Sequence, residues 1–469
     1  MLATMLVLLL PYALLCLLPL FLILAIAAVL ARSKPVAFVL GSAILAAEAA
    51  MSAYLLYANA DVLVLNTFHI YAFSTLFAAL FSTTLLLVNI LAFKYSKDYA
   101  ENLLMLSLVL AGAVILPASN TLLALLVCLE LIAVPTAFMM LLTGRRNVEA
   151  AVKFFIMSAV AMAMFSFALV LVFPYGMQMA LVALVANSGI GGTALAMLAL
   201  VLFVAALGIG AELFPFNLWV PDVYEGARSY VTAMLSGVNK TVALVALLEI
   251  SLVVFAAYKS TFSSIALLLS VATMFFGNLV ALTQRSVKRL LSYSSISQAG
   301  YILIGFAAAS QLGIEASIFQ IIAHAFMAIG AFAIVLWLES NDLMTIEDYA
   351  GLGNRSKFAA VSLTLLMLSM AGMPPLMGFV GKFLLFSSAI DSGMLLLAAI
   401  GILNSFISVF YFARVISAMF SSTEHAALRV GHYAAAVVVA ALAVLLAFGI
   451  YPQPLIAAAQ LASKALLGI

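Results

Sequence analysis

Apolar segments of about 20 residues recur along the whole chain, separated by short polar connections. A helix rises 1.5 Å per residue, so a helix of that length crosses the ~30 Å hydrocarbon core of a bilayer. The composition agrees, because 67% of the 469 residues are hydrophobic and only 8% are charged. Backbone groups in lipid must pair internally, and the apolar pattern does not alternate as it does in barrel strands. The sequence therefore predicts an all-α integral membrane protein.

Hydropathy divides the chain into about fourteen transmembrane helices, two of which are interrupted by prolines. The expected spans are 5–31, 36–58, 69–93, 101–117, 121–143, 149–174, 194–226 (broken), 229–257, 262–282, 292–310, 313–338, 357–390 (broken), 394–420 and 430–456. We expect four parts in these spans: an N-terminal three-helix segment (1–100), two five-helix segments (101–258 and 259–420) and a C-terminal helix (421–469).

Lysine and arginine are unevenly divided between the two sides of these spans, and such residues favour the cytoplasmic side. One side holds only Lys259 and Lys464. The other side holds fourteen of the 19 basic residues: Arg32, Lys34, Lys94, Lys97, Arg145, Arg146, Arg228, Arg285, Lys288, Arg289, Arg355, Lys357, Arg414 and Arg429. The asymmetry predicts a multi-pass protein of the inner (cell) membrane with both termini outside.

The sequence offers no cofactor or metal motif. Cys16 and Cys128 lie inside apolar spans, and no CxxC, Walker, dinucleotide-binding or zinc pattern is present. No soluble domain exists that is large enough to hold a redox group. We therefore expect no cofactor, no metal, no redox catalysis and no nucleic-acid partner.

Several ionisable residues interrupt the apolar spans. An ionisable group at mid-bilayer costs about 2.5–3.5 kcal/mol on insertion scales, which makes it rare without a function or a partner. Acids and bases at similar depth can pass protons if water joins them, because burial brings their pKa values closer together. The residues concerned are Lys153, Lys240, Lys382, Glu48, Glu130, Glu212, Glu249 and His324.

A structural role is the alternative for each of these residues. Lys153 is close enough to the inner surface to extend its amine to the interface. Glu249 is equally compatible with a structural place near the outer interface, and Glu48 with a helix–helix contact. Glu130 lies roughly 14 Å into its span, and Lys240 and Lys382 are comparably deep. A purely structural role therefore fits these three residues less well.

Two spans contain helix breakers near mid-membrane: Pro215 in one, and Pro374 with Pro375 in the other. Proline removes an amide donor, and the freed carbonyls are tolerated in a membrane only where protein or water satisfies them. Paired broken helices at corresponding positions are typical of transporters built from inverted repeats. We predict that spans 4–8 and 9–13 form two inverted five-helix repeats with breaks in helices 7 and 12.

Four segments resemble the antiporter-like membrane subunits of respiratory complex I. They are "VEAAVKFFIMSA", "FPFNLWVPDVYEGARSYVTAMLSGVNK", "QRSVKRLLSYSSISQAGYILIGF" and "LSMAGMPPLMGFVGKFLLFSSAI". The "PDVYEGA…VTA" and "GFVGKF" motifs resemble the N-type subunit of NADH-quinone oxidoreductase. Subunits of F420H2 dehydrogenase and membrane-bound hydrogenase complexes are similar.

The resemblance implies a proton-translocating subunit without a redox centre, surrounded by other membrane subunits. The family's proton-transfer positions fall on Glu130, Lys153, Lys240 and Lys382. The family's lysine in the broken seventh helix falls on Gly210, so that base is absent.

Two further family positions also differ. The histidine that follows the "PF" falls on Asn217, and the lysine that follows the His324 motif falls on Ala328. Because the usual lysine partner is missing, we expect Glu130 to pair with Lys153.

The expected proton path uses six residues. Glu130 and Lys153 would form the input pair, Lys240 the central relay, His324 a bridge and Lys382 the outlet. Glu212 would carry protons beside the break, in contact with Lys240. The basic cluster Arg285, Lys288 and Arg289 is expected to anchor the inner side or to contact another subunit.

Two other functions remain open. One is a subunit of an Mrp-type Na⁺/H⁺ antiporter, which shares this fold. The other is a structural spacer that has lost proton conduction, which the missing lysine at position 210 makes credible.

Overall fold

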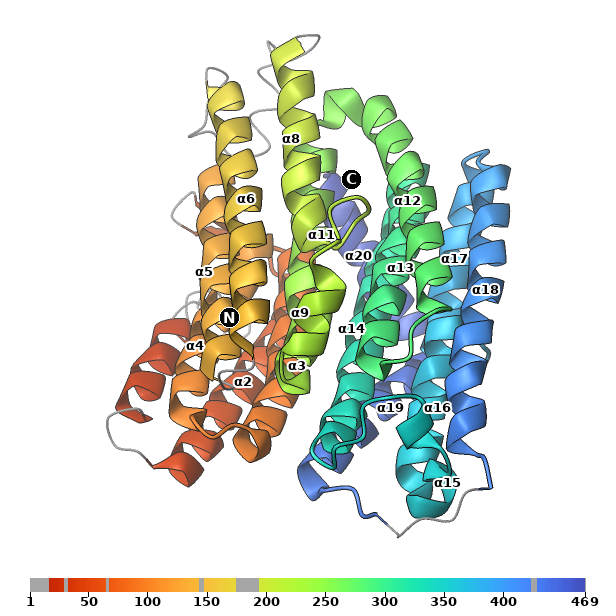
Figure 1. The fold of residues 1–469 in the computed structure, drawn as a ribbon. Coiled ribbons are helices and arrows are strands. Elements are labelled where there is room, and N and C mark those ends of the chain that lie inside the picture. The colour runs from red at the N-terminus through yellow and green to blue at the C-terminus, as the bar shows by residue number, and fades with distance from the viewer. Residues whose placement is uncertain are drawn as a thin grey trace. The chain divides into compact units, whose positions relative to one another are not determined.

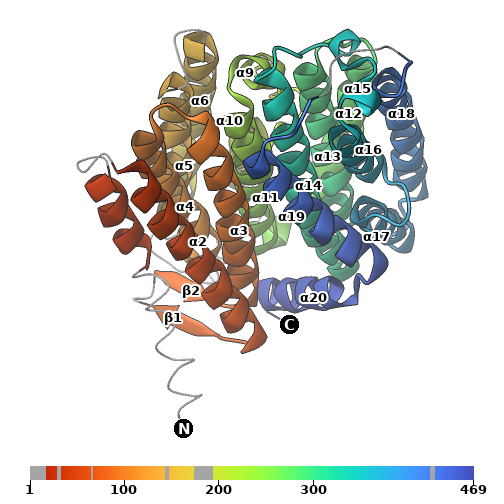
Figure 2. The same cartoon turned by 90° about the horizontal axis from the view of Figure 1, so that it is seen from below.

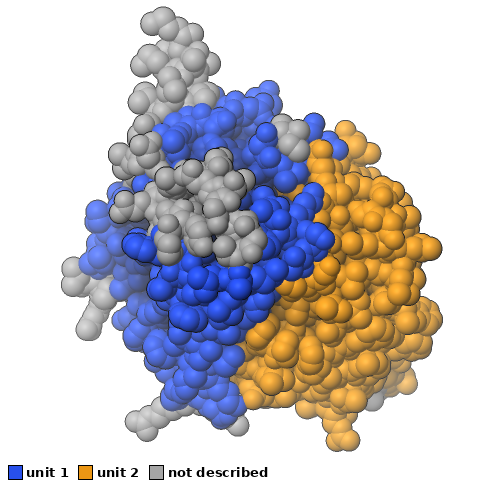
Figure 3. Space-filling model, turned by 90° about the horizontal axis from the view of Figure 1, so that it is seen from above, with its two compact units in different colours: residues 1–211, 238–262, 458–469 blue, residues 212–237, 263–457 orange. Residues whose placement is uncertain are grey.

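The computed structural model describes residues 17–28, 33–64, 67–142, 147–173, 194–422 and 428–468. The chain forms two compact units, which Figure 3 colours separately. Unit 1 contains Met1–Ala211, Val238–Phe262 and Ala458–Ile469, and unit 2 contains Glu212–Gly237 and Ser263–Ala457. Helices make up nearly all of the described structure (Figure 1).

Unit 1 is a series of long helices in which neighbours in sequence pack side by side. Two short antiparallel strands, paired with Leu63 opposite His69, follow its first labelled helix. The elements are α2 (Lys34–Tyr57), β1 (Val62–Val64), β2 (Phe68–Ile70), α3 (Ala72–Tyr95), α4 (Tyr99–Ile115), η1 (Leu116–Ala118), α5 (Leu122–Leu142), α6 (Val148–Val172), α8 (Ala194–Gly210), α11 (Lys240–Glu249), the π-helix η6 (Ile250–Val254) and η7 (Ala256–Tyr258).

Unit 2 is built around one long helix, α14 (Gln311–Glu339), whose apolar window is completely buried by its neighbours. The other elements are α9 (Val220–Gly226), α10 (Ser229–Met234), α13 (Val287–Ala308), η8 (Glu347–Tyr349), α15 (Leu352–Arg355), α16 (Lys357–Ala371), α17 (Met377–Asp391), α18 (Leu395–Met419) and α19 (His432–Ile450). The π-helix η5 (Leu235–Asn239), α12 (Lys259–Ala281) and α20 (Gln453–Leu467) contain residues of both units.

Ten helices of the described chain are long and apolar enough to cross a membrane, which confirms the expectation of an all-helical membrane protein. Four expected spans are not among them. Only 17–28 of the first span is described, and it forms a short apolar helix. The two proline-containing spans are divided into the shorter helices α8, α9, α16 and α17, and α13 carries many hydroxyl side chains.

The two breaks lie where the prolines predict them. Helix α8 ends at Gly210 and α9 begins at Val220, with Pro215 between them. Helix α16 ends at Ala371 and α17 begins at Met377, with Pro374 and Pro375 between them.

Candidate functional site

A chain of hydrogen bonds joins two of the expected residues, Glu212 and His324, within unit 2. The Tyr224 hydroxyl donates to Glu212 Oε1, and the Ser295 hydroxyl donates to Glu212 Oε2 at 3.1 Å. Ser295 Oγ lies 3.0 Å from Ser236 Oγ, which in turn lies 3.4 Å from His324 Nε2. All five side chains are at least 97% buried. We call these five residues the polar chain.

The backbone explains how Glu212 reaches its partners. Its φ of 63° places it in the left-handed region, just beyond the end of α8. The helix has already ended at this point, so helical spacing from Gly210 does not set the direction of the Glu212 side chain. The turn presents the carboxylate to Tyr224 of α9 and Ser295 of α13, two helices that pack against each other.

Ser236 and His324 complete the polar chain from two further elements. Ser236 lies in the π-helix η5, and π-segments are rare and occur frequently at functional sites. His324 lies near the middle of the buried helix α14. The sequence identified Glu212 and His324. It did not identify Ser295 and Ser236, which connect them, or Tyr224, which donates to the Glu212 end.

A second polar cluster in unit 2 surrounds Lys382. Its Nζ donates to the Ala371 carbonyl oxygen at 3.1 Å and to Ser405 Oγ at 2.8 Å. The same ammonium group lies 4.2 Å from the centroid of the Tyr301 ring, a cation–π distance. Ala371 is the last residue of α16, so Lys382 and Ser405 satisfy a carbonyl that the break frees.

Amide side chains lie between the two breaks of unit 2 in sequence. Gln320 of α14 donates to Gln298 of α13 at 3.0 Å. Gln298 donates to the carbonyl oxygen of Met370, the residue before Ala371, at 2.9 Å. A second freed carbonyl at the α16 terminus is thereby satisfied, as burial in a membrane requires.

The input residues expected in unit 1 are less enclosed than those of unit 2. Glu130 on α5 is only partly buried, and it makes no hydrogen bond or ion pair with any described residue. Lys153 Nζ lies 2.7 Å from Glu149 Oε1, one turn earlier on α6, and its side chain is 40% exposed. This ion pair joins Lys153 to a neighbour on its own helix and not to Glu130.

Lys240 is fully buried at the start of α11, directly after η5. It belongs to unit 1 and Glu212 to unit 2, and their contact stays a prediction. The preceding residue, Asn239, donates to Thr136 Oγ1 of α5 at 2.9 Å. The helix that contains Lys240 is therefore attached to the helix that contains Glu130.

Two of the three positions where the family pattern is lost, Gly210 and Asn217, have different surroundings. A Cβ at Gly210 would lie 3.0 Å from the Ala243 Cβ of α11, which is tighter than ordinary contact. Asn217 is fully buried, and its amide Nδ2 and Oδ1 have no hydrogen-bond partner among the described residues. Close packing of α8 on α11 thus accounts for the absence of a side chain at position 210.

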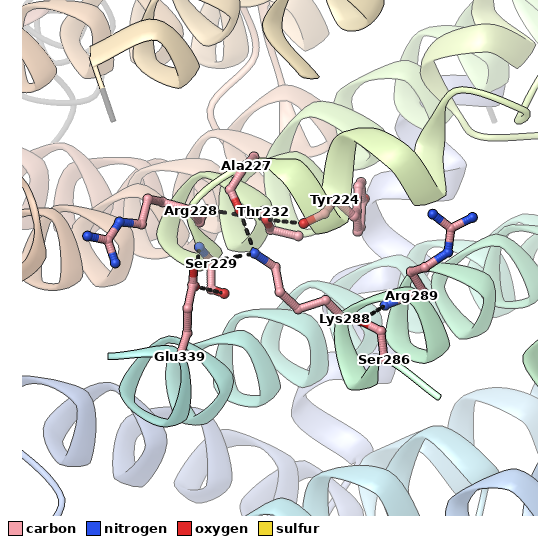
Figure 4. A network of polar contacts seen from close by, with 9 residues as sticks. All are labelled: Tyr224, Ala227, Arg228, Ser229, Thr232, Ser286, Lys288, Arg289 and Glu339. Carbon is pink, nitrogen blue, oxygen red and sulfur yellow. Dashed lines mark hydrogen bonds and ion pairs between the residues drawn. The ribbon is translucent and has the colours of Figure 1, made fainter. Parts of the chain in front are cut away.

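Lys288 and Arg289, two residues of the basic cluster, bind the segment that follows the first break, and Figure 4 shows the contacts of Lys288. Lys288 is 95% buried, donates to the Ala227 carbonyl oxygen and lies 3.7 Å from Glu339 Oε1. Arg289 Nη1 lies 2.9 Å from Asp222 Oδ1 and 3.0 Å from Glu225 Oε2. The two acids of the "PDVYEG" motif are therefore ligands of one guanidinium group.

Glu48, the remaining acid singled out in an early span, is fully buried on α2. Neither of its carboxylate oxygens has a hydrogen-bond partner in the described part of the chain.

Comparison with known proteins assigns the family. The model of the NADH:quinone oxidoreductase/Mrp antiporter transmembrane family matches residues 119–408. The chain is 36% identical over 426 residues to F(420)H(2) dehydrogenase subunit N of Methanosarcina mazei, covering 86% of this chain and 85% of that protein. It is 34% identical over 429 residues to NADH-quinone oxidoreductase subunit N of Desulforamulus reducens, covering 88% of each.

A solved structure agrees. A chain of respiratory complex I from Thermus thermophilus superposes with a TM-score of 0.80 at 27% identity, covering 95% of this chain and 98% of that one. The motifs, the buried ionisable residues and these similarities lead to one assignment: the chain belongs to the NADH:quinone oxidoreductase/Mrp antiporter family of multi-pass membrane subunits.

Proposed function

We propose that this chain is the proton-translocating, N-type subunit of a complex I-type oxidoreductase whose electron carrier is reduced elsewhere in the assembly. The observation that carries the proposal is the polar chain, which runs from Glu212 to His324 without leaving the buried interior of unit 2. Its family membership supports the same conclusion. The other membrane subunits of such a complex are its partners.

The chemistry of the polar chain suits proton transfer. Each hydroxyl both donates and accepts, so a proton that enters at one end can leave at the other after the hydroxyls rotate. Glu212 and His324 can each bind or release a proton, and histidine changes charge within the physiological pH range. Ser295 and Ser236 then act as connectors between the two proton-binding ends, and Tyr224 orients the Glu212 carboxyl group.

The remaining residues extend the path. Glu130 and Lys153 serve as the input, Lys240 as the relay and Lys382 as the outlet. Lys382 supports this role because it is buried without a carboxylate partner in the described structure and is bound only by neutral groups, an environment in which an amine can lose its proton.

The proposal includes a topology of fourteen spans, with inverted repeats in spans 4–8 and 9–13 and both termini outside the inner membrane. The two breaks support the repeats, because each contains a left-handed residue, Glu212 or Gly372, three positions before a proline. Single cysteines at Ser392 and Ser421 test the orientation. A membrane-impermeant thiol reagent added outside should label only position 392, and labelling of position 421 alone would reverse the topology.

The function is tested with the intact complex in proteoliposomes, where proton uptake is measured per electron pair. Glu212→Gln keeps the shape of the side chain but removes its proton-binding oxygen, and we expect proton translocation to fall about tenfold, the size of effect that a positioned proton carrier gives. Glu315→Gln is the matched control, since Glu315 is also a buried glutamate of unit 2, accepts a hydrogen bond from Gln311 of its own helix and is not a member of the polar chain.

The same assay separates the two other functions. Sodium movement that persists when the membrane is made permeable to protons would indicate a Na⁺/H⁺ antiporter subunit. Undiminished proton translocation in both Glu212→Gln and Lys382→Ala, with normal assembly, would indicate a structural spacer.

A further inference from the structure

Unit 1 contains a cavity of about 580 Å³ that the proposed proton path does not use. Its polar lining consists of Asp61, His69, Tyr71, Ser119, Asn120 and Glu249. The segments that form it lie far apart in sequence: the β1–β2 hairpin, the start of α5, the end of α11 with η6, and the end of α20 (Figure 2). Asp61 has a side chain that is 76% exposed, so the cavity reaches the surface.

Glu249 is the buried end of this cavity. It is only 2% exposed, and its Oε2 has no hydrogen-bond partner among the described residues. It is the last residue of α11, five residues before the end of the span Ser229–Val254, or about 8 Å along the helix axis. A buried carboxyl group without a counter-charge is costly as an anion, so this site favours an oxygen that binds a proton.

The local backbone is unusual at the same point. Helix α11 gives way directly after Glu249 to the π-helix η6. The other π-segment of this span, η5, ends directly before the buried Lys240. Both buried ionisable residues of the span therefore adjoin a π-segment, a feature associated with functional sites.

A titratable pair stands at the exposed end of the cavity. His69 Nε2 lies 2.6 Å from Asp61 Oδ1, and both side chains are at least 36% exposed. The His69 ring stacks on Tyr71 with 4.4 Å between ring centroids. Burial raises the pKa of the Tyr71 phenol well above its usual value, and the charges of Glu249 and Asp61 raise it further. Tyr71 therefore lies within the electrostatic reach of both carboxyl groups.

The surroundings favour a proton over a metal ion. Among the described residues, no three His, Cys, Asp or Glu side chains are grouped so as to hold a metal ion. Helix α8, which packs against α11, contains no ionisable side chain. The neighbouring elements also carry Cys128 and Glu130 on α5 and Tyr258 in η7. The Cys128 Sγ lies 3.8 Å from Ser119 Oγ. Lys464, at the end of α20, is exposed.

We propose that Glu249 is a proton-exchange group of unit 1, connected to the aqueous phase by this cavity and the Asp61–His69 pair. The proton leaves a carboxyl oxygen of Glu249, which remains as a carboxylate. Water in the cavity or the His69 imidazole accepts the proton and later gives it to bulk water. In the proposed topology this face is the outer one, so the role as a release site rests on the proposed function.

The first experiment measures access and does not depend on proton pumping. In a background with Cys16→Ala and Cys128→Ala, the intact complex carries either Glu249→Cys or Ser251→Cys. Ser251 is the matched control, since it is 1% exposed, lies two residues further along the span and does not line the cavity. A membrane-impermeant methanethiosulfonate added on the hairpin face should modify position 249 at least about tenfold faster, because a wetted thiol reacts and an enclosed one does not. Equal rates would overturn the proposal.

The second experiment measures proton translocation by the intact complex. We expect Glu249→Gln to lower it about tenfold and Glu249→Asp to retain most of it, since only the glutamine lacks a proton-binding oxygen. We expect His69→Gln to alter how translocation depends on the pH of the hairpin face, an effect that a structural role would not produce. Normal translocation and pH dependence in Glu249→Gln, while Glu212→Gln and Lys382→Ala are impaired, would refute this site and leave the proposed function standing. Normal translocation in all three variants would refute the proposed function as well.

Discussion

The two helix breaks share one backbone plan and differ in chemistry. Each has a left-handed residue three positions before a proline, Glu212 with φ 63° in the first and Gly372 with φ 87° in the second. The left-handed residue of the first break is itself an acid, and hydroxyl donors surround it. In the second break that residue is a glycine, and the charge comes from Lys382 on the following helix, where it meets oxygen acceptors.

The difference shows how the same backbone arrangement, a left-handed residue three positions before a proline, can serve two roles. A carboxylate at a break needs hydrogen-bond donors. When the carboxyl group is protonated, it can pass its proton to the oxygen atoms of the same hydroxyl groups. An ammonium group at a break needs acceptors, and the carbonyl oxygens freed by proline are acceptors already in place. The first break therefore begins a chain of hydroxyl groups, whereas the second holds a base directly against the freed backbone.

The largest effect is expected at the second break. Lys382→Ala removes the base and leaves the Ala371 carbonyl with Ser405 as its partner. We expect proton translocation to fall at least about tenfold while the complex still assembles. Lys357→Ala, which removes an exposed lysine at the start of α16, should have no effect. Equal rates of proton translocation in the two variants would show that Lys382 at the second break has no functional role.

The next effect concerns the base that the first break lacks. Gly210→Lys would bring a Cβ within 3.0 Å of the Ala243 Cβ. Overpacking of this kind costs about 1–3 kcal/mol, so we expect a lower melting temperature of the complex and less assembled subunit. Ala243→Gly should restore both in the double variant. A stable Gly210→Lys single variant would show that packing does not exclude a lysine there.

A smaller effect is expected where the first break is anchored. Arg289 contacts both Asp222 and Glu225, and a lysine cannot reproduce the fork of a guanidinium group. We expect Arg289→Lys to lower stability by no more than about 1 kcal/mol, because the two acids are about 40% exposed. A double-mutant cycle with Asp222→Asn measures the coupling energy between Arg289 and Asp222. A coupling energy of zero would contradict the claim that this ion pair stabilises the first break.

The smallest effect is expected in the turn that precedes α16 and the second break. A backbone hydrogen bond from Thr345, with further ones from the Thr345 hydroxyl and the Met344 amide, holds the pKa of Asp348 below its usual value. A lowered pKa adds stability above the unfolded-state value, about 3.9, and this stability is lost as the pH falls through the lower folded-state value. Asp348→Asn should therefore reduce the loss of thermal stability on acidification below about pH 4. If the thermal stability of the variant fell with acidification as much as that of the unmodified protein, the lowered pKa of Asp348 would be contradicted.

Much of the fold follows from the sequence because its causes are local. Runs of apolar residues form the spans, and Pro215, Pro374 and Pro375 lie in the two interruptions between helices. Lys382 and His324 are buried as their positions in the middle of spans predict.

The hydroxyl residues of the polar chain could not be predicted from local sequence patterns. Tyr224, Ser236 and Ser295 carry ordinary hydroxyl groups, and only the packing of three separate elements brings them into line. The direction of the Glu212 side chain could not be predicted either, because a left-handed turn cannot be inferred from helical spacing.

The burial of Lys288 was not predicted either. Its place in a basic cluster next to a loop indicates a surface anchor, yet it is 95% buried and binds Ala227 and Glu339. Charge next to a loop predicts the side of the membrane, but it does not predict whether a neighbouring helix covers the side chain.

The central claim is that the polar chain conducts protons, and Ser295→Ala tests it most directly. The substitution removes a single oxygen, which donates to Glu212 Oε2 and contacts Ser236 Oγ, and so interrupts the chain between Glu212 and His324. Positioned proton-transfer groups typically contribute a hundredfold or more to a rate, so loss of this link should decrease the rate at least about tenfold. The measurement is the initial rate of proton uptake by proteoliposomes at equal electron flow. We predict a decrease of that size in fully assembled complex, and a rate equal to that of the unmodified complex would contradict the claim.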